Sequence, residues 1–237
     1  MPAHDMTTIH ESEVFLLIAD ISGYTRFMLT NRTARVHAHG IVSDLLETVA
    51  RAATPPLAVN KFEGDAIFMV APRTAAGWEE AGRMLGERLT GFLDAFNARL
   101  TQLASSNICD CIACQQMVTL RLKVIAHHGV AVRSRIAGFD EVSGVDVILI
   151  HRLLKNHIAA SEYILLTEPA YAFLSPPGDY ATHREDYDDV GEVAARLREV
   201  DAAVPAAAPR RLSWADAWRK LGYDLKYLCA RQRHPAV

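Results

Sequence analysis

The sequence predicts an α+β protein with a mainly antiparallel sheet and helices packed on one face of it. Three observations support this prediction: short apolar runs alternate with helical stretches, two of the runs flank a tight turn at Gly64, and 50% of the 237 residues are hydrophobic. A chain of that length and composition buries a sizeable core. Strands and helices interleaved around a central hairpin are typical of this fold class.

The first half of the chain supplies the hairpin. Residues 14–19 form an apolar run that predicts a strand buried on both faces, and the run ends at Asp20. Apolar residues then recur at spacings of three and four from Ile41 to Val49, which predicts a helix that ends at the prolines of residues 54–56. Two short runs on either side of Phe62-Glu63-Gly64-Asp65 predict a β-hairpin.

The second half continues the alternation. Its clearest element is a helix from Trp78 to Leu100 with a single apolar stripe. A loop that contains three cysteines follows this helix. The further elements that we expect are, in order, a strand at 119–126 that continues through 130–137, a helix at 145–158, a strand at 163–166, a short helix at 168–174 and a strand at 193–200.

Charge and hydropathy exclude several classes of protein. The chain has 25 Lys and Arg against 28 Asp and Glu, a net charge of −3, whereas a dedicated nucleic-acid binder is usually basic. No apolar run is long enough to cross a bilayer. The polar first thirteen residues lack the pattern of a secretory signal. We therefore expect a cytoplasmic protein that binds neither nucleic acid nor membranes.

Two aspartates occupy matched positions. Asp20 follows the first strand and Asp65 lies in the hairpin turn, so both carboxylates would meet at one end of the sheet if these strands are neighbours. Such oxygen ligands suit Mg²⁺ or Mn²⁺ bound together with substrate phosphates. The segment Ser22-Gly23-Tyr24-Thr25 would offer backbone N–H groups to a polyphosphate. The alternative is that Asp20 is only a helix cap and Asp65 only a turn residue.

Both segments also resemble a known family. Residues 15–25 (FLLIADISGYT) are similar to the opening signature of the class III nucleotidyl cyclases, and residues 61–66 (KFEGDA) to their second signature. The resemblance extends from about Val14 to Leu174 and implies the ferredoxin-like nucleotidyl cyclase fold. Residues 147–156, together with the three cysteines, resemble a bacterial subfamily of unassigned function. The resemblance divides the chain into a flexible N-terminus (1–13), a cyclase-like catalytic domain (14–201), and an Ala/Pro-rich connector with a C-terminal helix (202–237).

The resemblance implies a role for each matching residue. Asp20, Asp65 and the carbonyl of Ile21 would hold two Mg²⁺ or Mn²⁺ ions, which activate a ribose 3′-hydroxyl and stabilise the leaving pyrophosphate. Lys61 and Glu141 would read the purine base. Arg152 would stabilise negative charge on the phosphate in the transition state, for which a guanidinium is well suited.

The resemblance also implies a head-to-tail homodimer, in which the metal ions of one chain meet Arg152 of the other. One position departs from the family: the third signature expects an asparagine that holds the ribose, and this chain has Ile148. The loss of one such contact costs on the order of 10²–10³ in rate. Two functions therefore stay open, a cyclase that acts on a nucleoside triphosphate (ATP favoured) and a cyclase-like module that binds a nucleotide or a partner without turnover.

The cysteine segment predicts a possible structural metal site. Cys109, Cys111 and Cys114 form a C-x-C-x-x-C sequence, and Zn²⁺ requires a fourth ligand. The candidates for this ligand are His127, His128 and Cys229, while His37 and His39 lie on opposite sides of a helix start and form no ligand pair. The alternatives are a reduced loop without metal and a metal or redox sensor coupled to the sheet.

Overall fold

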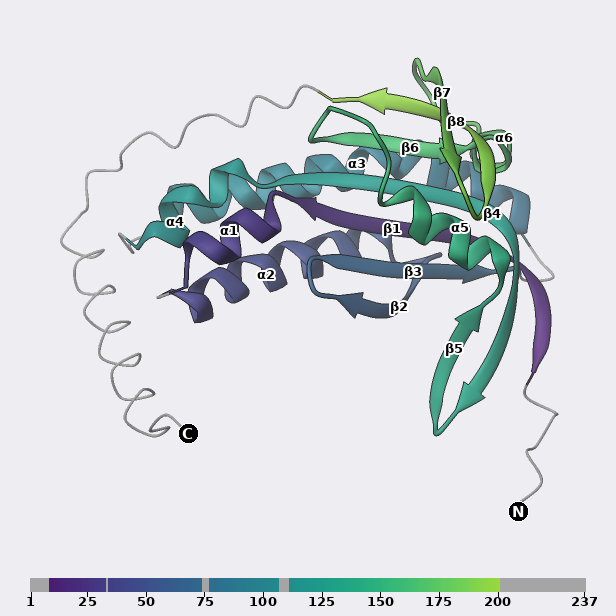
Figure 1. The fold of residues 1–237 in the computed structure, drawn as a ribbon, viewed down its shortest axis with the longest axis horizontal. Helices are drawn as coiled ribbons and strands as arrows, with labels where there is room; N and C mark the ends of the chain where they lie inside the picture. Colours follow the sequence, from purple (N-terminus) through teal and green to yellow (C-terminus); the bar gives the residue numbers. More distant parts are fainter. Residues whose placement is uncertain (1–8, 33, 74–76, 107–110, 201–237) are drawn as a thin grey trace.

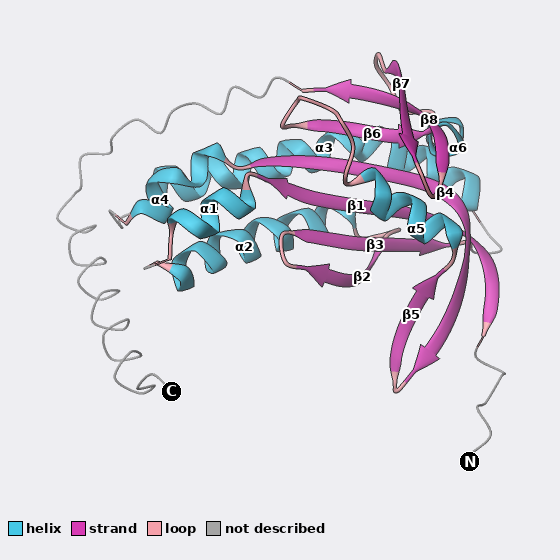
Figure 2. Ribbon diagram, viewed as in Figure 1, coloured by secondary structure: helices cyan, strands magenta, loops and turns pink. Residues whose placement is uncertain are grey.

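The computed structural model describes residues 9–32, 34–73, 77–106 and 111–200. It confirms the predicted α+β class, with helices around one large, mainly antiparallel sheet (Figure 1, Figure 2). The predicted connector and C-terminal helix of 202–237 lie outside the described residues, as does most of the predicted N-terminal segment. In the part of the chain that the structure describes, no helix is both long and apolar enough to span a membrane.

The strands follow the order β2-β3-β1-β4-β6-β8-β7 across the sheet, and β5 pairs with β4. All pairs are antiparallel except β4 and β6. The bounds of the strands are β1 His10–Ser22, β2 Ala58–Glu63, β3 Ala66–Pro72, β4 Arg121–Ile136, β5 Phe139–Ser143, β6 Tyr163–Thr167, β7 Ala181–Tyr187 and β8 Gly191–Glu199.

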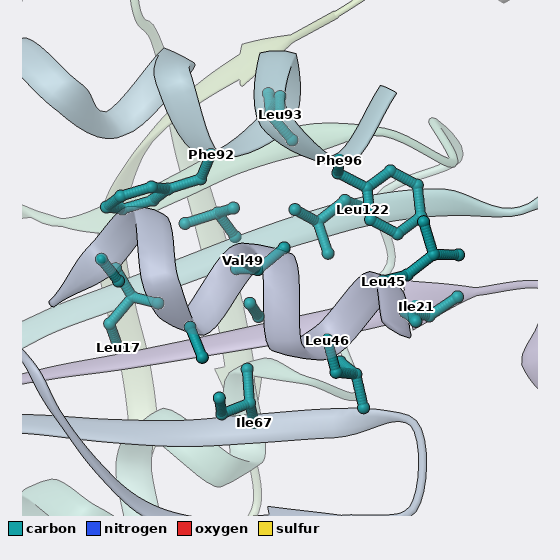
Figure 3. Close-up of a cluster of buried hydrophobic side chains, with 14 of the residues drawn as sticks. Leu17, Ile21, Leu45, Leu46, Val49, Ile67, Phe92, Leu93, Phe96 and Leu122 are labelled. Atoms are coloured by element: carbon teal, nitrogen blue, oxygen red, sulfur yellow. The ribbon is translucent and has the colours of Figure 1, made fainter. Parts of the chain in front are cut away.

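Two long helices cover one face of the sheet (Figure 1). Alternate residues of β1, including Leu17 and Ile21, meet apolar side chains of α2 and α3 in the larger of two buried clusters (Figure 3). The helices are α1 Tyr24–Thr30, α2 Arg35–Ala53, α3 Trp78–Ser106, α4 Ile112–Gln116, α5 Val145–Leu153 and α6 Glu168–Leu174, with the 3-10 turn η2 Met117–Thr119.

The expectation that the helices lie on one face is wrong for α5. Ile150 and Leu153 of α5 pack with Leu16 and Ile18 of β1 in a second cluster, on the face opposite α2 and α3. Successive side chains of a strand point to opposite faces, so β1 is buried on both sides, as its continuous apolar run predicts. A helical pattern shows that a helix has an apolar side but not which face of a sheet this side covers.

Several element boundaries also differ from the prediction. The cysteine segment contains the short helix α4 rather than only a loop, and β1 begins at His10 rather than Val14. Helix α5 ends at Leu153 instead of residue 158. Just beyond this end, the Asn156 side chain donates a hydrogen bond to the Leu153 carbonyl. Strands β5 and β7, which are short and largely exposed, were not predicted because neither has an apolar run.

The predicted continuation of the 119–126 strand through 130–137 is confirmed, because β4 is one strand from Arg121 to Ile136. Gly129 in its middle allows a close approach: a Cβ atom there would collide with the Asp146 carboxylate. Asp146 accepts a hydrogen bond from the Val130 N–H, 2.6 Å away, which ties the first turn of α5 to β4.

Candidate functional site

A cavity of about 700 Å³ lies where β1 ends and the β2–β3 hairpin turns. Asp20 and Asp65 both line this cavity, and so does the segment Ser22–Thr25, which leads from β1 into α1. Its lining comes from β1, α1, the hairpin turn, the α4–η2 region and β4, and comprises Asp20, Ile21, Ser22, Gly23, Tyr24, Thr25, Arg26, Phe27, Thr30, Asp65, Gln116, Thr119, Lys123 and Ser161.

The backbone holds the two aspartates side by side. Asp20 lies opposite Ala66 in the β1–β3 ladder, so Asp65 is one residue beyond this pair. The Ile21 N–H donates a hydrogen bond to the Asp65 carbonyl, 2.9 Å away. Gly64, with a φ of 73°, makes the tight turn that brings Asp65 to the end of β1. The sequence prediction that the two carboxylates meet at one end of the sheet is therefore confirmed by the strand register.

Burial and, for Asp20, the charge of Asp65 shift the pKa values of this pair. The pKa of Asp20 is raised from 3.8 to about 6, first by burial and then by the nearby charge of Asp65. Burial also raises the pKa of Asp65. Lys123 opposes both shifts, and its Nζ lies 3.8 Å from an Asp20 carboxylate oxygen. A nearby cation favours the charged form of each carboxylate.

The sequence analysis missed Lys123. It lies in the middle of an alternating strand, where a lysine normally faces solvent, and nothing in its neighbourhood marks it as functional. The structure pairs it with Asp20 across β1 and β4, so the two side chains stand on the same face of the sheet. The missing signal was the register between two strands about one hundred residues apart.

The donor set of the cavity fits divalent cations that prefer oxygen ligands. Burial raises the pKa of both carboxylates, and the charge of Asp65 raises the pKa of Asp20 further. A bound cation would lower both pKa values, because an opposite charge favours the ionised form of a carboxylate. Mg²⁺ and Mn²⁺ are bound through one or two carboxylates and complete their shell with water or phosphate oxygens.

The segment Ser22-Gly23-Tyr24-Thr25 forms the corner from β1 into α1. Gly23 has a φ of 89° and precedes the helix, so a residue with a side chain would be strained there. Its carbonyl accepts the first helical hydrogen bond, from the Phe27 N–H at 2.9 Å. All four residues line the cavity next to Asp20.

The other predicted site residues do not line this cavity. Lys61 lies on β2, 3.6 Å from Glu63, and Glu141 lies on β5. The two strands are joined where the Asn60 side chain donates to the Asp140 carbonyl at 3.3 Å. A separate hollow of about 410 Å³ between these strands is lined by Glu141 but not by Lys61.

Arg152 lies on α5, where it forms an ion pair with Asp189. It borders a third hollow, of about 460 Å³, together with Ile148, which occupies the position of the expected asparagine. Ile148 is 55% exposed. Within one chain, therefore, the structure brings together the predicted metal-binding residues and the Ser22–Thr25 segment, but not the predicted base-reading residues or the arginine.

The cysteine segment meets a histidine that the sequence analysis had set aside. Cys111 and Cys114 lie at the start and middle of α4, and their sulfur atoms approach Nδ1 of His37 from the first turn of α2. The histidines named as candidate ligands have other partners: His127 Nδ1 is 2.8 Å from Thr167 Oγ1, and His128 Nε2 is 2.9 Å from Glu13. Cys109 and Cys229 lie outside the described residues.

Comparison with other sequences places the chain among proteins without an assigned activity. Residues 42–163 match the family described as "Protein of unknown function (DUF2652)". An uncharacterized protein of Mycobacterium tuberculosis, Rv2561/Rv2562, is 32% identical over 203 residues, which cover 80% of this chain and 92% of that protein.

Comparison with solved structures identifies the fold. The adenylyl cyclase CyaB from P. aeruginosa superimposes with a TM-score of 0.61 at 13% identity, over 81% of this chain and 96% of the other. The guanylyl cyclase Cya2 gives a TM-score of 0.59 at 15% identity, over 87% of this chain and 99% of the other. The sheet and its flanking helices thus have the fold of adenylyl and guanylyl cyclase domains.

Proposed function

The chain belongs to the family described as Protein of unknown function (DUF2652), and we propose that it is a nucleotidyl cyclase that converts a nucleoside triphosphate, with ATP favoured, to a 3′,5′-cyclic nucleotide and pyrophosphate. The observation that carries this proposal is the cavity in which Asp20 and Asp65 meet at the end of a cyclase-fold sheet. A triphosphate substrate also agrees with the cytoplasmic location expected from the sequence.

In this proposal Asp20, Asp65 and the Ile21 carbonyl hold two Mg²⁺ or Mn²⁺ ions. When bound, the ions would lower the pKa of the ribose 3′-hydroxyl and stabilise charge on the leaving pyrophosphate. Lys123, 3.8 Å from Asp20, favours the ionised form of this carboxylate and so keeps it ready to bind a cation near neutral pH.

The cavity has the size and lining that a nucleotide needs. Its volume of about 700 Å³ lies in the range of small-molecule sites. Ser22–Thr25 line the cavity at the corner between β1 and α1, where their backbone N–H groups would bind the polyphosphate. In the reaction the 3′-oxygen loses its proton and bonds to the α-phosphorus, the bond between this phosphorus and the β-phosphate oxygen breaks, and pyrophosphate leaves with that electron pair.

Lys61 and Glu141 are the proposed base-reading pair. Both belong to the strands on either side of the β2–β5 contact, outside the cavity of the same chain. The lysine would donate to an acceptor on the purine ring, and the glutamate would accept from an exocyclic amine. Guanine also carries an exocyclic amine, but its N1 holds a proton and cannot accept from the lysine. Adenine N1 can accept, and this favours ATP.

A homodimer would unite these separated parts. Large apolar side chains are exposed on α5 and on the β4–β5 hairpin, two elements that contact each other. We name this set the α5–hairpin patch; its members are Val130, Ile136, Phe139, Val145 and Ile148. Large apolar residues exposed on neighbouring elements are typical of interaction surfaces. A head-to-tail pair would place Arg152 of each chain at the cavity of the other, so the dimer has two complete sites or none.

Ile148 favours a second candidate function, a module that binds the nucleotide without turnover. An isoleucine offers no hydrogen bond to a ribose, and its side chain is 55% exposed rather than needed for packing. The retention of both cavity aspartates and of Arg152 supports the enzyme instead.

The test is a product assay on the purified full chain with ATP, GTP, CTP and UTP, each with Mn²⁺, analysed by chromatography. We expect a cyclic product that is lost in Asp65→Ala and kept in Asp186→Ala, a matched change at an exposed aspartate on β7. Turnover that survives in Asp65→Ala refutes the proposed mechanism. Binding of a triphosphate without product from any of the four, by folded dimeric protein, would establish the second function.

A further inference from the structure

Three soft ligand atoms from two distant segments converge beside the cavity. Nδ1 of His37 lies 3.5 Å from the sulfur of Cys111 and 4.0 Å from that of Cys114. All three ligand atoms are within 4.8 Å of one another, and all three side chains are half-buried. The histidine and Cys111 are 74 residues apart in the sequence, so this convergence is produced by the fold.

The spacing of these atoms suits a single zinc ion. With Zn–S of about 2.3 Å and Zn–N of about 2.0 Å, tetrahedral geometry puts sulfur and nitrogen ligands about 3.5 Å apart. The two observed distances from nitrogen to sulfur, 3.5 and 4.0 Å, fall at or slightly beyond this value. Two thiolates and an imidazole are a donor set that selects Zn²⁺ over Mg²⁺ or Mn²⁺.

The local structure also indicates a need for such an anchor. Helix α4 has only five residues and no side-chain cap at its N-terminus. A helix this short is not stable by itself and depends on tertiary contacts. Its two cysteines pack at the edge of the larger buried cluster, and Ala113 between them is fully buried.

The group of His37, Cys111 and Cys114 lies next to the wall of the cavity that contains Asp20 and Asp65. Gln116, the last residue of α4, lines the cavity, and Thr119 lines it two residues after α4 gives way to η2. The Gln116 side chain accepts a hydrogen bond of 3.4 Å from Asn31, a buried residue that follows α1. Helix α4 contacts both α1 and α2, as their adjacent positions in Figure 1 show. Whatever holds α4 to α2 therefore holds this side of the cavity.

We propose that His37, Cys111 and Cys114 supply three of the four ligands of one structural Zn²⁺ ion, which joins α4 to the start of α2 and fixes the cavity wall formed by Gln116 and Thr119. This site is separate from the oxygen-ligand site at Asp20 and Asp65, and it does not depend on the cyclase activity. In this site His37 takes the place of His127 and His128 as the nitrogen ligand beside the cysteine pair.

The first test is the metal content of the full chain, measured by mass spectrometry of the purified protein and of its variants. We expect about one zinc per chain, and at least a tenfold loss in His37→Ala and in Cys114→Ser. The matched control is His39→Ala, because His39 lies on the same helix turn but faces Ser43 at 3.4 Å. Zinc content unchanged in His37→Ala, or iron in place of zinc, would overturn the assignment.

A second measurement keeps the test decisive if a variant fails to fold. Wild-type protein stripped of zinc is titrated with Co²⁺, and absorption bands from thiolate-to-cobalt charge transfer and a tetrahedral centre are expected. Hydrogen exchange is then compared with and without Zn²⁺. Removal of zinc should speed exchange at least about tenfold in residues 112–119 and leave β1 and β3 unchanged. No cobalt bands, or equal exchange in residues 112–119, would refute the site whether or not the protein is a cyclase.

Discussion

The two faces of the sheet carry different kinds of side chain. On the face covered by α2 and α3, the strands present buried apolar residues such as Leu17 and Ile21 (Figure 3). On the opposite face, Asp20 continues the row of Leu16 and Ile18, and Lys123 stands beside it. Helix α5 covers this second face only toward the end of the strands away from Asp20 (Figure 1).

The two faces therefore differ in role: one stabilises the fold, and the other carries the site of the proposed function. The face covered by α2 and α3 supplies the larger cluster of buried apolar side chains. The buried Glu162 also lies at this face, where it accepts a hydrogen bond of 2.7 Å from Asn97 of α3. The α5 face holds the charged residues where water or a ligand can reach them, together with the exposed α5–hairpin patch. In the proposed function, a second copy of the chain completes this face.

The largest expected effect comes from dividing the site between two chains. Arg152→Ala and Asp65→Ala should each lower the rate of cyclic-product formation by at least about 10²–10³. Mixing the two variants should restore up to about a quarter of the wild-type rate, because half of the random dimers are mixed and each has one intact site. The measurement is the product assay on the separate and the mixed proteins.

The control for this mixture is a pair of variants from the same cavity. Asp65→Ala mixed with Asp20→Ala leaves one damaged carboxylate in every site, so no activity should return. Recovery in this control mixture, or none between Arg152→Ala and Asp65→Ala in folded dimers, would show that Arg152 of one chain does not complete the cavity of the other.

The next effect concerns the interface itself. Phe139 is 71% exposed on the β4–β5 hairpin, and Phe139→Glu should weaken dimerisation by on the order of 10² in Kd, because a buried charge replaces an aromatic contact. Met84→Glu is the matched control, since Met84 is 48% exposed but lies on α3, on the other face. Sedimentation over a range of concentrations measures both. Equal dimerisation of Phe139→Glu and wild type would exclude the hairpin from the interface.

A smaller effect, in this case an increase in the rate of cyclic-product formation, is expected from Ile148→Asn. An amide at this position supplies the ribose contact that the resemblance expects, and the rate should rise on the order of tenfold or more. The substitution should cost little stability because the side chain is 55% exposed. Ile148→Ala, which removes the apolar bulk without adding a hydrogen-bonding group, is the control. The same rate in both variants would show that residue 148 does not contact the ribose.

Local patterns were sufficient to predict most of this fold and one part of the site. The strand that ends at Asp20 and the turn at Gly64 are each specified by a few adjacent residues, so the meeting of Asp20 with Asp65 could be predicted. The face on which α5 packs could not be predicted, because an apolar stripe fits either side of a sheet. Strands β5 and β7 could not be predicted because they are largely exposed, and an exposed strand needs no apolar run.

The missed site residues share one property, which is that their partners are distant in the sequence. Lys123 reaches Asp20 only through the register of β1 with β4. His37 reaches the cysteines only because the start of α2 lies against α4. His37 was set aside because it forms no ligand pair with His39, and its approach to the cysteines depends on the packing of α4 against α2. Sequence distance is a poor guide once a long helix such as α3 separates two segments.

The smallest expected effect tests whether the charged Asp20 carboxylate destabilises the folded state. Its pKa in the folded chain, about 6, lies above the ordinary value of 3.8, so the unfolded state releases its proton first as the pH rises. Stability therefore falls between about pH 4 and pH 6 and stays reduced above that range. Asp20→Asn removes the charge, loses the attraction to Lys123, and should stabilise the protein at pH 7 by about 1–2 kcal/mol, or about 4 °C in Tm.

The same comparison at pH 3 gives the contrast that a structural role alone would not produce. There Asp20 is protonated in both states for most molecules, so the difference in Tm between Asp20→Asn and wild type should nearly vanish. Asp186→Asn, on the exposed side of β7, should change Tm little at either pH. An Asp20→Asn protein less stable than wild type at pH 7 would mean that the carboxylate stabilises the fold. A stabilised variant that no longer forms product would mean instead that this end of the α5 face gives up stability to keep a charge where a cation can bind.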